Sequence, residues 1–388
     1  MRIRELRAWP TDPDEAAALR REWNGLAANA EHASVFQGYD WHAAWWECFG
    51  NGHALHLLMV YETGGELVAI APLMIATRRR LGVPVRRLML LGTGNHASDY
   101  ADLIVRKGHA RPRAAVLEWM RAHRHLWTEL ELRNLPGHSP TLKLLGETRG
   151  LAGPVLVECA AEAPTRRLGD AEADRAVLAK RSLRRHWNGF QREAPVRLLR
   201  LERSQALDAH CARFFEQHQA RWAGTASPSL FRDPAQRRFY RLLAHRLAAS
   251  GLLHFSMVEW QGRAIAYHFG FEQDGVLTWY KPSFDPVLAR RSPGEVLLRL
   301  LLEDAIGCGL RELDFTVGAE AFKYRFANHV RRVYRVRAWR RGAERAPALA
   351  LAALKAWLRR RRAAPERPLR PSRNGGRVSG GTHPARST

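Results

Sequence analysis

Long hydrophobic runs are absent from this sequence of 388 residues. No apolar stretch approaches the roughly 18–20 residues that a membrane-spanning helix needs. The first seven residues, MRIRELR, carry charges where a secretory signal peptide would have its apolar core. We therefore expect no export and no spanning segment, and we predict a cytoplasmic location.

Cysteine is scarce, with four residues that are scattered along the chain and form no C-x-x-C pair. This spacing argues against a disulfide framework and favours a reducing compartment. The histidines, including His53/His56 and His123/His125, have no companion ligands at metal-binding spacing. We therefore predict no structural or catalytic metal.

Acidic residues are few relative to basic ones. The chain has 38 Asp and Glu and 62 Lys and Arg, which gives a net charge of +24. From Arg331 onward there are 17 basic and two acidic residues, so the C-terminal part carries +15 and residues 1–330 carry +9. Because the excess charge lies mainly in the tail, it says little about a catalytic groove. No nucleic-acid-binding motif is recognisable, and we expect no nucleic-acid partner.

The tail itself divides into two predicted parts, which together span 341–388. Residues 347–362 place leucines at helical spacing ahead of four arginines, which predicts a short basic amphipathic helix. The Pro-, Gly-, Arg- and Ser-rich remainder is typical of disorder. The helix either docks on its own domain or attaches peripherally to the anionic inner membrane.

The second half of the chain shows a readable order of elements, β-α-α-β-β-β-α-β-α-β after a basic helix over 170–190. Strands are predicted at 196–201, 252–260, 264–271, 276–281, 311–316 and 330–340, and helices near 205–222, 233–250, 295–308 and 320–327. The helix over 295–308 connects two strands and therefore predicts a parallel pair with a crossover.

The first half can be interpreted in the same order. Strands are predicted at 3–9, 55–61, 67–75, 85–91, 101–105, 127–132 and 153–159, with helices at 14–30, 39–49, 110–122 and 141–149. Both halves contain a similar hairpin segment, Gly65–Ala69 and Gly262–Ala266. We therefore predict a tandem repeat with an N-terminal domain over 1–160, a linker over 160–169 and a C-terminal domain over 170–340.

A helix start in the second half is a candidate anion site. Ala289–Gly294 carries two arginines and leads through Pro293 and Gly294 into the helix over 295–308. The free N–H groups of a helix N-terminus attract anions such as a pyrophosphate. The plainer alternative is that Pro293 and Gly294 only start the helix.

Three sets of residues resemble a known superfamily. They are Ser98–Asp102, the pair Phe284-Asp285-Pro286 and Ser292-Pro293-Gly294, and the run D-F-x-x-G-x-E-x-x-K-x-R-F from Asp314 to Phe326. With the element order, they make residues 30–335 similar to the GNAT superfamily of acyltransferases in a double-domain form. More narrowly, the chain resembles the CelD-type or BioF2-like acetyltransferases found near polysaccharide biosynthesis, and more distantly the FemAB peptidoglycan aminoacyltransferases.

The resemblance implies an α/β (α+β) fold of two tandem GNAT-like domains, each a mixed, mostly antiparallel sheet flanked by helices. It also implies that acetyl-CoA lies between the fourth and fifth strands of a domain, with its pyrophosphate on the loop before the third helix. The corresponding cofactor-binding residues here are Arg290, Arg291, Ser292, Pro293, Gly294 and Glu295. The relatives carry several glycines in this loop, and the single Gly294 departs from that pattern.

Acyl transfer needs a base and a group that protonates the departing thiolate. Asp314 and Glu320 are the candidate bases. His268 is a further candidate base, most useful with a hydroxyl acceptor, although most strand histidines are structural. Tyr280 and Tyr324 are candidate acids, with packing in the core as the alternative.

Several charged residues are candidates for substrate binding, and each has a plainer alternative. Glu320 and Lys323 are i,i+3 neighbours that can simply pair on a helix surface, and the acids near residue 100 can simply cap a turn. The basic face over 180–185 is either solvated or contacts an anionic, nucleotide-linked substrate. The candidate substrate-binding residues are Asp99, Tyr100, Asp102, Lys281, Lys323 and Arg325.

The sequence therefore predicts transfer of an acetyl group from acetyl-CoA to an amine or hydroxyl of a polysaccharide or cell-envelope precursor. The first alternative is a FemAB-type aminoacyltransferase that uses aminoacyl-tRNA. The second is a non-catalytic protein that binds nucleic acid or a membrane. The sequence predicts no oligomeric state.

Overall fold

The computed structural model describes residues 1–340, except 33, 81–82, 96, 149–150 and 152. The predicted amphipathic helix and the remainder of the tail lie outside the described residues. Among the residues that are described, no helix is both long and apolar enough to cross a membrane.

The first half contains seven strands and four helices in the described residues. The strands are β1 (Arg2–Leu6), β2 (His53–Tyr61), β3 (Leu67–Arg80), β4 (Val83–Leu90), β5 (Ile104–Val105), β6 (Glu129–Pro136) and β7 (Val155–Arg167). The helices are α1 (Pro13–Ala27), α2 (Tyr39–Phe49), α3 (Arg111–Ala122) and α4 (Pro140–Glu147). Asp12 caps α1 by accepting from the N–H groups of Asp14 and Glu15.

The second half has the predicted order, preceded by two short helices. These are α5 (Ala171–Leu178) and α6 (Arg181–Gln191). The strands are β8 (Val196–Arg200), β9 (Leu253–Trp260), β10 (Arg263–Gln273), β11 (Val276–Phe284), β12 (Glu312–Asp314) and β13 (His329–Trp339). The helices are α7 (Leu207–Arg221), α8 (Pro234–Ala249), α9 (Pro293–Gly307) and α10 (Ala321–Phe326).

Two local predictions were wrong. The single helix expected over 170–190 is broken, because Lys180, with φ -53° and ψ 129°, leaves the helical conformation between α5 and α6. The segment 160–169, expected as a linker, is mostly strand, because β7 continues to Arg167 and pairs there with β12. No Gly or Pro marks the break at Lys180, whereas Pro164 lies inside β7 and Gly169 follows it, residues that are more typical of a linker than of a strand.

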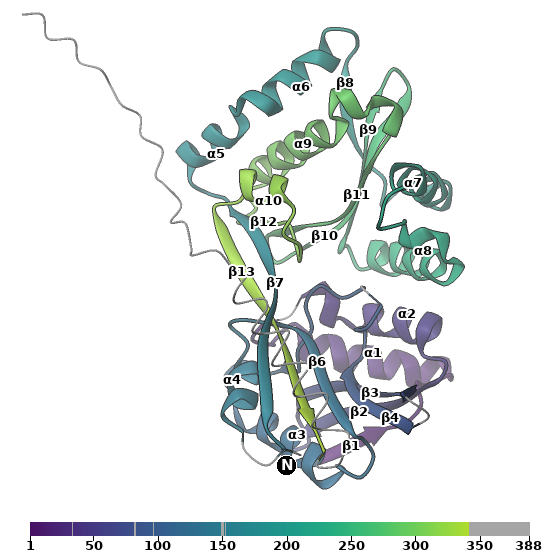
Figure 1. Cartoon of the computed structure of the whole chain (residues 1–388), viewed down its shortest axis with the longest axis vertical. Helices are drawn as coiled ribbons and strands as arrows, with labels where there is room; N and C mark the ends of the chain where they lie inside the picture. Colours follow the sequence, from purple (N-terminus) through teal and green to yellow (C-terminus); the bar gives the residue numbers. More distant parts are fainter. Residues whose placement is uncertain (33, 81–82, 96, 149–150, 152, 341–388) are drawn as a thin grey trace, which may run out of the picture. The chain divides into compact units, whose positions relative to one another are not determined.

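The strands join into a single sheet in which the two halves exchange their last strands. The order is β1-β2-β3-β4-β6-β13-β7-β12-β11-β10-β9-β8. β13 of the second half pairs with β6 of the first, and β7 of the first half pairs with β12 of the second. β7 and β13 also pair with each other and run between the halves (Figure 1). Each half therefore completes its sheet with a strand of the other.

The parallel pair predicted around α9 is confirmed. β11 and β12 pair in parallel from Val276↔Glu312 to Thr278↔Asp314, and β4 and β6 form the corresponding parallel pair in the first half. The tandem, mostly antiparallel α/β fold is thus present. Beyond Asp314 the chain turns to β7 instead, because the N–H groups of Phe315 and Gly318 donate to carbonyls of β7. β11 continues to Phe284 paired only with β10, so β11 and β12 diverge.

Helices cover both faces of the sheet, and α7 and α8 lie opposite α9 in the second half (Figure 1). One apolar core lies under α1, α2, α7 and α8 and is shared by the halves, with Trp41 5.5 Å from Phe239 between ring centroids. A second core lies under α3 and α4, and a third under α9. The shared core packs α2 of the first half against α8, β10 and β11 of the second.

Candidate functional site

A cavity of about 400 Å³ lies where the two halves meet. The segment between α1 and α2 contributes Phe36, and the loop after β4 contributes Tyr100. The second half contributes Thr278, Asp314 and Arg331. Thr278 and Asp314 are the last paired residues of β11 and β12, so the cavity lies at the point where these strands diverge.

Asp314 is the best-placed base in this cavity. Its carboxylate accepts from the Tyr100 hydroxyl at 2.8 Å and from the Thr316 backbone N–H at 2.8 Å. The side chain is only 3% exposed. Burial raises the pKa of Asp314 to about 6, although the Arg331 guanidinium opposes the shift. The carboxyl is therefore mostly ionised at neutral pH and is basic enough to accept a proton.

Arg331 joins Asp314 to a second acid, Glu312. Arg331 lies on β13, where Nη1 is 3.4 Å from Asp314 Oδ2 and Nη2 donates to Glu312 Oε2. The other Glu312 oxygen, Oε1, is buried without a hydrogen-bond partner in the described part of the chain. The sequence analysis singled out neither Arg331 nor Glu312. The E-L-D alternation of β12 was an available signal, because residues i and i+2 of a strand share a face.

A second polar cluster surrounds Asp99, whose neighbour Tyr100 faces Asp314. Asp99 and Lys281 are both half-buried. Burial raises the pKa of Asp99, and Lys281 and a hydrogen bond with Thr316 oppose that shift. Burial lowers the pKa of Lys281, and Asp99 opposes that shift. The Lys281 ammonium lies 4.1 Å from the Tyr280 ring centroid. The structure thus brings together residues that are about 180 positions apart.

Lys323 extends this cluster from α10. Its side chain is 4% exposed, and Nζ donates to the Val317 carbonyl at 3.0 Å and pairs with Glu320 at 3.0 Å. Gly318 permits this approach, because a Cβ there would lie 2.7 Å from Lys323 Nζ and 2.2 Å from Glu320 Oε2. The predicted Glu320–Lys323 pair is present, but its lysine end is buried rather than on the surface.

Two tryptophans of α2 fix the loop that carries Asp99 and Tyr100. The indole N–H of Trp41 donates to Ser98 Oγ at 2.9 Å, and that of Trp45 donates to Asn95 Oδ1 at 3.0 Å. Both side chains are buried in the core that the two halves share. Their N–H groups also orient the loop toward β11 and β12.

The predicted donor turn begins α9, but its side chains have partners within the protein. Arg291 pairs with Glu193 at 2.9 Å and stacks on Phe190, with its guanidinium carbon 4.2 Å from the ring centroid. Glu295 accepts from Arg325 at 2.9 Å. Arg290 is exposed, Ser292 is left-handed at φ 57°, and Pro293 occupies the first turn. None of Arg290–Glu295 lines the 400 Å³ cavity.

The remaining candidates have other surroundings. The Tyr280 hydroxyl donates to the Ala97 carbonyl and accepts from Tyr240 at 2.9 Å, and burial raises its pKa strongly. His268 is fully buried, lies 3.2 Å from the Thr278 carbonyl through Nε2, and has a pKa lowered by burial. Asp102 is buried, accepts from the Leu103 backbone N–H at 2.7 Å, and has a pKa raised by burial.

Tyr324 is the other candidate acid from the sequence. Its hydroxyl donates to Glu162, and burial together with that carboxylate raises the pKa of Tyr324 to about 12. The phenol does not line the 400 Å³ cavity. Of the titratable groups proposed for chemistry, Asp314 and Tyr100 therefore share the cavity, whereas Tyr280, Tyr324 and His268 lie outside it.

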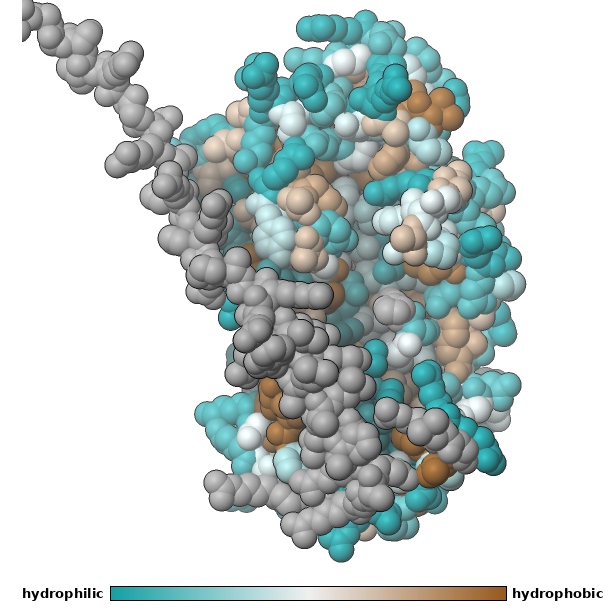
Figure 2. Space-filling view, viewed as in Figure 1, coloured by the Kyte–Doolittle hydropathy of each residue, from teal (hydrophilic) through white to brown (hydrophobic). Residues whose placement is uncertain are grey.

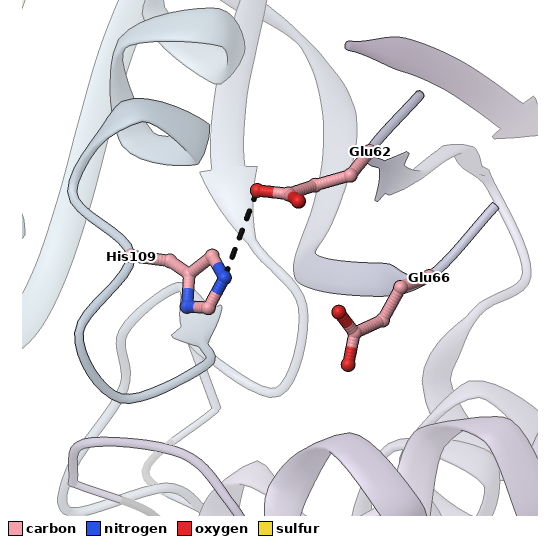
Figure 3. A group of neighbouring side chains, drawn as sticks. All are labelled: Glu62, Glu66 and His109. Atoms are coloured by element: carbon pink, nitrogen blue, oxygen red, sulfur yellow. Dashed lines mark ion pairs between the residues drawn. The ribbon is translucent and has the colours of Figure 1, made fainter. Parts of the chain in front are cut away.

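One group of side chains has the composition of a metal site. Glu62 and Glu66 of the β2–β3 hairpin face His109 (Figure 3), and their ligand atoms lie within 4.8 Å of one another. Arg106 pairs with Glu66 at 3.0 Å, and His109 Nε2 lies 3.6 Å from Glu62. These ion pairs account for the cluster, and we assign it no ligand.

Comparison with known families finds a match in the second half of the chain, which covers part of the site. Residues 179–324 match the model of the acetyltransferase (GNAT) domain family. The matched stretch contains the α9 turn, Asp314 and Lys323. Over these residues the second half is therefore similar to the acetyltransferase (GNAT) domain family. No significant match is found among curated proteins.

Solved structures share the whole-chain fold at low sequence identity. The crystal structure of FemX has a TM-score of 0.55 at 10% identity, and the match covers 81% of this chain and 95% of FemX. For L-PGS from Bacillus licheniformis the TM-score is 0.54 at 11% identity, and the match covers 92% of this chain and 99% of L-PGS. A third structure is the C-terminal domain (DUF2156) of a protein named as a lysylphosphatidylglycerol synthetase from Agrobacterium fabrum. Its TM-score is 0.53 at 11% identity, and the match covers 87% of this chain and 96% of that domain. At these identities the likeness describes the fold.

Proposed function

We propose that this chain is an acyltransferase that moves an acetyl group from acetyl-CoA to an amine or hydroxyl of a polysaccharide or cell-envelope precursor. The observation that carries the proposal is the position of Asp314. This carboxyl, with a pKa of about 6, lines the cavity at the point where β11 and β12 diverge. A donor lying between the diverging strands would bring its acyl carbon to the end of the cavity that holds the base.

In this proposal, Asp314 and the residues around it each have a separate role in the transfer. Asp314 accepts a proton from the acceptor, and Tyr100 and Arg331 fix the carboxylate at 2.8 and 3.4 Å. Lys281 and Lys323 supply positive charge beside Asp99, where they would balance the anionic parts of a donor or acceptor. The backbone N–H groups that begin α9 would receive the pyrophosphate. The acetyl-CoA, when bound, supplies the activated thioester.

A second candidate function is aminoacyl transfer from aminoacyl-tRNA. It is favoured by the TM-scores of 0.53–0.55 over most of the chain with structures named FemX, L-PGS and lysylphosphatidylglycerol synthetase. The last name denotes a product that carries a lysyl group. It is also favoured by Arg291 and Glu295, which are engaged with Glu193 and Arg325 and leave the α9 turn less open to a small donor.

Release of the donor's leaving group distinguishes these two functions. The full chain is incubated with acetyl-CoA and an amino sugar, and free thiol is followed with a thiol-reactive dye. A parallel reaction uses tRNA charged with a radiolabelled amino acid. Acceptor-dependent thiol release is the expected result, and the Asp314→Asn variant should lack it. Thiol release no faster than in that variant, together with acceptor-dependent deacylation of the tRNA, would replace acetyl-CoA with the aminoacyl donor.

A further inference from the structure

Helix α6 carries a row of cations that the rest of the protein does not neutralise. Lys180, Arg181, Arg184, Arg185 and Arg192 are all exposed, and α6 contains no acidic residue. Within the described residues, no carboxylate forms an ion pair with any of these five, and the Arg185 guanidinium bonds only to the imidazole of His186, at 3.2 Å. Like charges this close repel one another, so the row destabilises the isolated helix.

Other surface arginines of this protein do have acidic partners. Arg238 and Arg246 both pair with Glu47, at 2.7 and 2.8 Å, and Arg20 pairs with Asp40 at 2.8 Å. Exposed arginines without an acidic partner also occur elsewhere among the described residues, such as Arg21, Arg111 and Arg124, but α6 and its two caps gather five such cations within residues 180–192. In the face drawn in Figure 2, hydrophilic side chains gather over the end of the molecule that carries α6 and β8.

An open groove of about 430 Å³ runs beside this row, between α5, α6 and α9. Trp187, Arg184, Asn188 and Arg299 line it, and the Arg299 guanidinium carbon lies 5.4 Å from the Trp187 ring centroid. An indole and an arginine plane form a platform on which a nucleobase can stack, and an exposed amide can bond to a base edge. The groove thus combines cations for phosphates with a surface for a base.

The groove is also joined to the α9 turn. Arg291 donates to the Gly189 carbonyl of α6 at 3.0 Å, and Arg325 donates to Ser182 Oγ at 3.0 Å. From these observations we propose that α6 and its Trp187 groove bind single-stranded nucleic acid, with RNA as the partner. An anionic membrane fits less well, because the apolar residues of α6, Leu183 and Phe190, are buried in the third core. From the sequence, the basic face over 180–185 is expected either to be solvated or to contact an anionic, nucleotide-linked substrate, and nucleic acid is only an alternative partner.

The test uses the full chain and a fluorescein-labelled single-stranded uridine 12-mer RNA, with binding followed by anisotropy. Arg181→Gln, Arg184→Gln and Arg185→Gln are combined in one variant. We expect its affinity to fall by about tenfold or more, and the slope of log affinity against log salt to fall by about two, because three phosphate contacts are lost. The matched control combines Arg21→Gln, Arg111→Gln and Arg124→Gln in the first half and should change affinity less than about twofold.

Trp187 separates base stacking from charge. Trp187→Ala should weaken binding by about tenfold with an unchanged salt slope, and Trp187→Phe should restore most of the affinity. Equal losses in the α6 variant and its control, or an unchanged affinity in the α6 variant, would overturn the proposal. Sedimentation with phosphatidylglycerol vesicles tests the membrane alternative. If the α6 variant lost binding to these vesicles but still bound RNA as the wild type does, the proposal would also be overturned. The assay contains no acyl donor or acceptor, so its failure and a failure of acetyl transfer are separate results.

Discussion

Replacing Asp314 by asparagine should lower the rate of acyl transfer by about 10²–10⁴-fold, the usual contribution of a positioned general base. Asparagine keeps the shape and still accepts from the Tyr100 hydroxyl, but it cannot take up a proton. The loss should therefore appear in kcat, with a small change in KM. Steady-state kinetics with acetyl-CoA and the acceptor measure both constants.

The pH profile gives the same prediction an independent readout. Because the pKa of Asp314 is about 6, the wild-type rate should fall about tenfold per pH unit below that value. The folded-state pKa lies above the ordinary value of 3.8, so this group's contribution to stability declines as the pH rises from 3.8 to about 6. Glu312→Gln should keep an acid limb but move it to lower pH, because the Glu312 charge raises the pKa of Asp314. An Asp314→Asn variant with wild-type kcat would remove Asp314 as the base.

Replacing Lys323 by methionine should reduce transfer by about 10²–10³-fold, a loss typical of removing one preorganised charge-stabilising donor. Methionine retains the length of the buried stem but removes the positive charge near Asp99. It also leaves the Thr316 and Val317 carbonyls without their donor. We therefore expect the free energy of unfolding to fall by about 1–3 kcal/mol, which denaturant titration would measure alongside the kinetics.

Glu320→Gln is the matched control for Lys323→Met. Its carboxylate is 57% exposed and pairs with the same ammonium, so its loss removes only an exposed ion-pair partner. Surface pairs of this kind contribute about 0–1 kcal/mol, and transfer should change less than about threefold. If Glu320→Gln lost as much activity as Lys323→Met, the ion pair itself would be the functional feature rather than the buried lysine.

The repeat of elements could be predicted from sequence because it rests on local patterns. The β11-α9-β12 unit follows from a helix between two apolar runs, which requires a parallel crossover. The exchange of β7 and β13 between the halves could not be predicted in this way. A strand's alternation indicates which residues share a face but not which strand it pairs with, and β7 looks like an ordinary strand followed by a linker.

The candidate site was predicted residue by residue but not as an assembly. Asp314 and Tyr100 were each singled out, yet their hydrogen bond joins positions 214 residues apart, and no local pattern encodes that contact. Arg331 was counted as part of the basic tail because its strand is mixed and basic. His268 has the residue type of a base, but only the packing of α9 over β10 shows that it is enclosed.

Binding of acetyl-CoA to the full chain, measured by isothermal titration, tests the central claim most directly. We predict binding in the micromolar range that Gly294→Trp abolishes, because a Cβ at this position already lies 3.3 Å from the Phe284 ring and an indole would fill the α9 turn. Val287→Trp, at a position 84% exposed in the preceding turn, should bind as the wild type does. Absence of binding, or equal binding by Gly294→Trp, would contradict a thioester donor held at this turn.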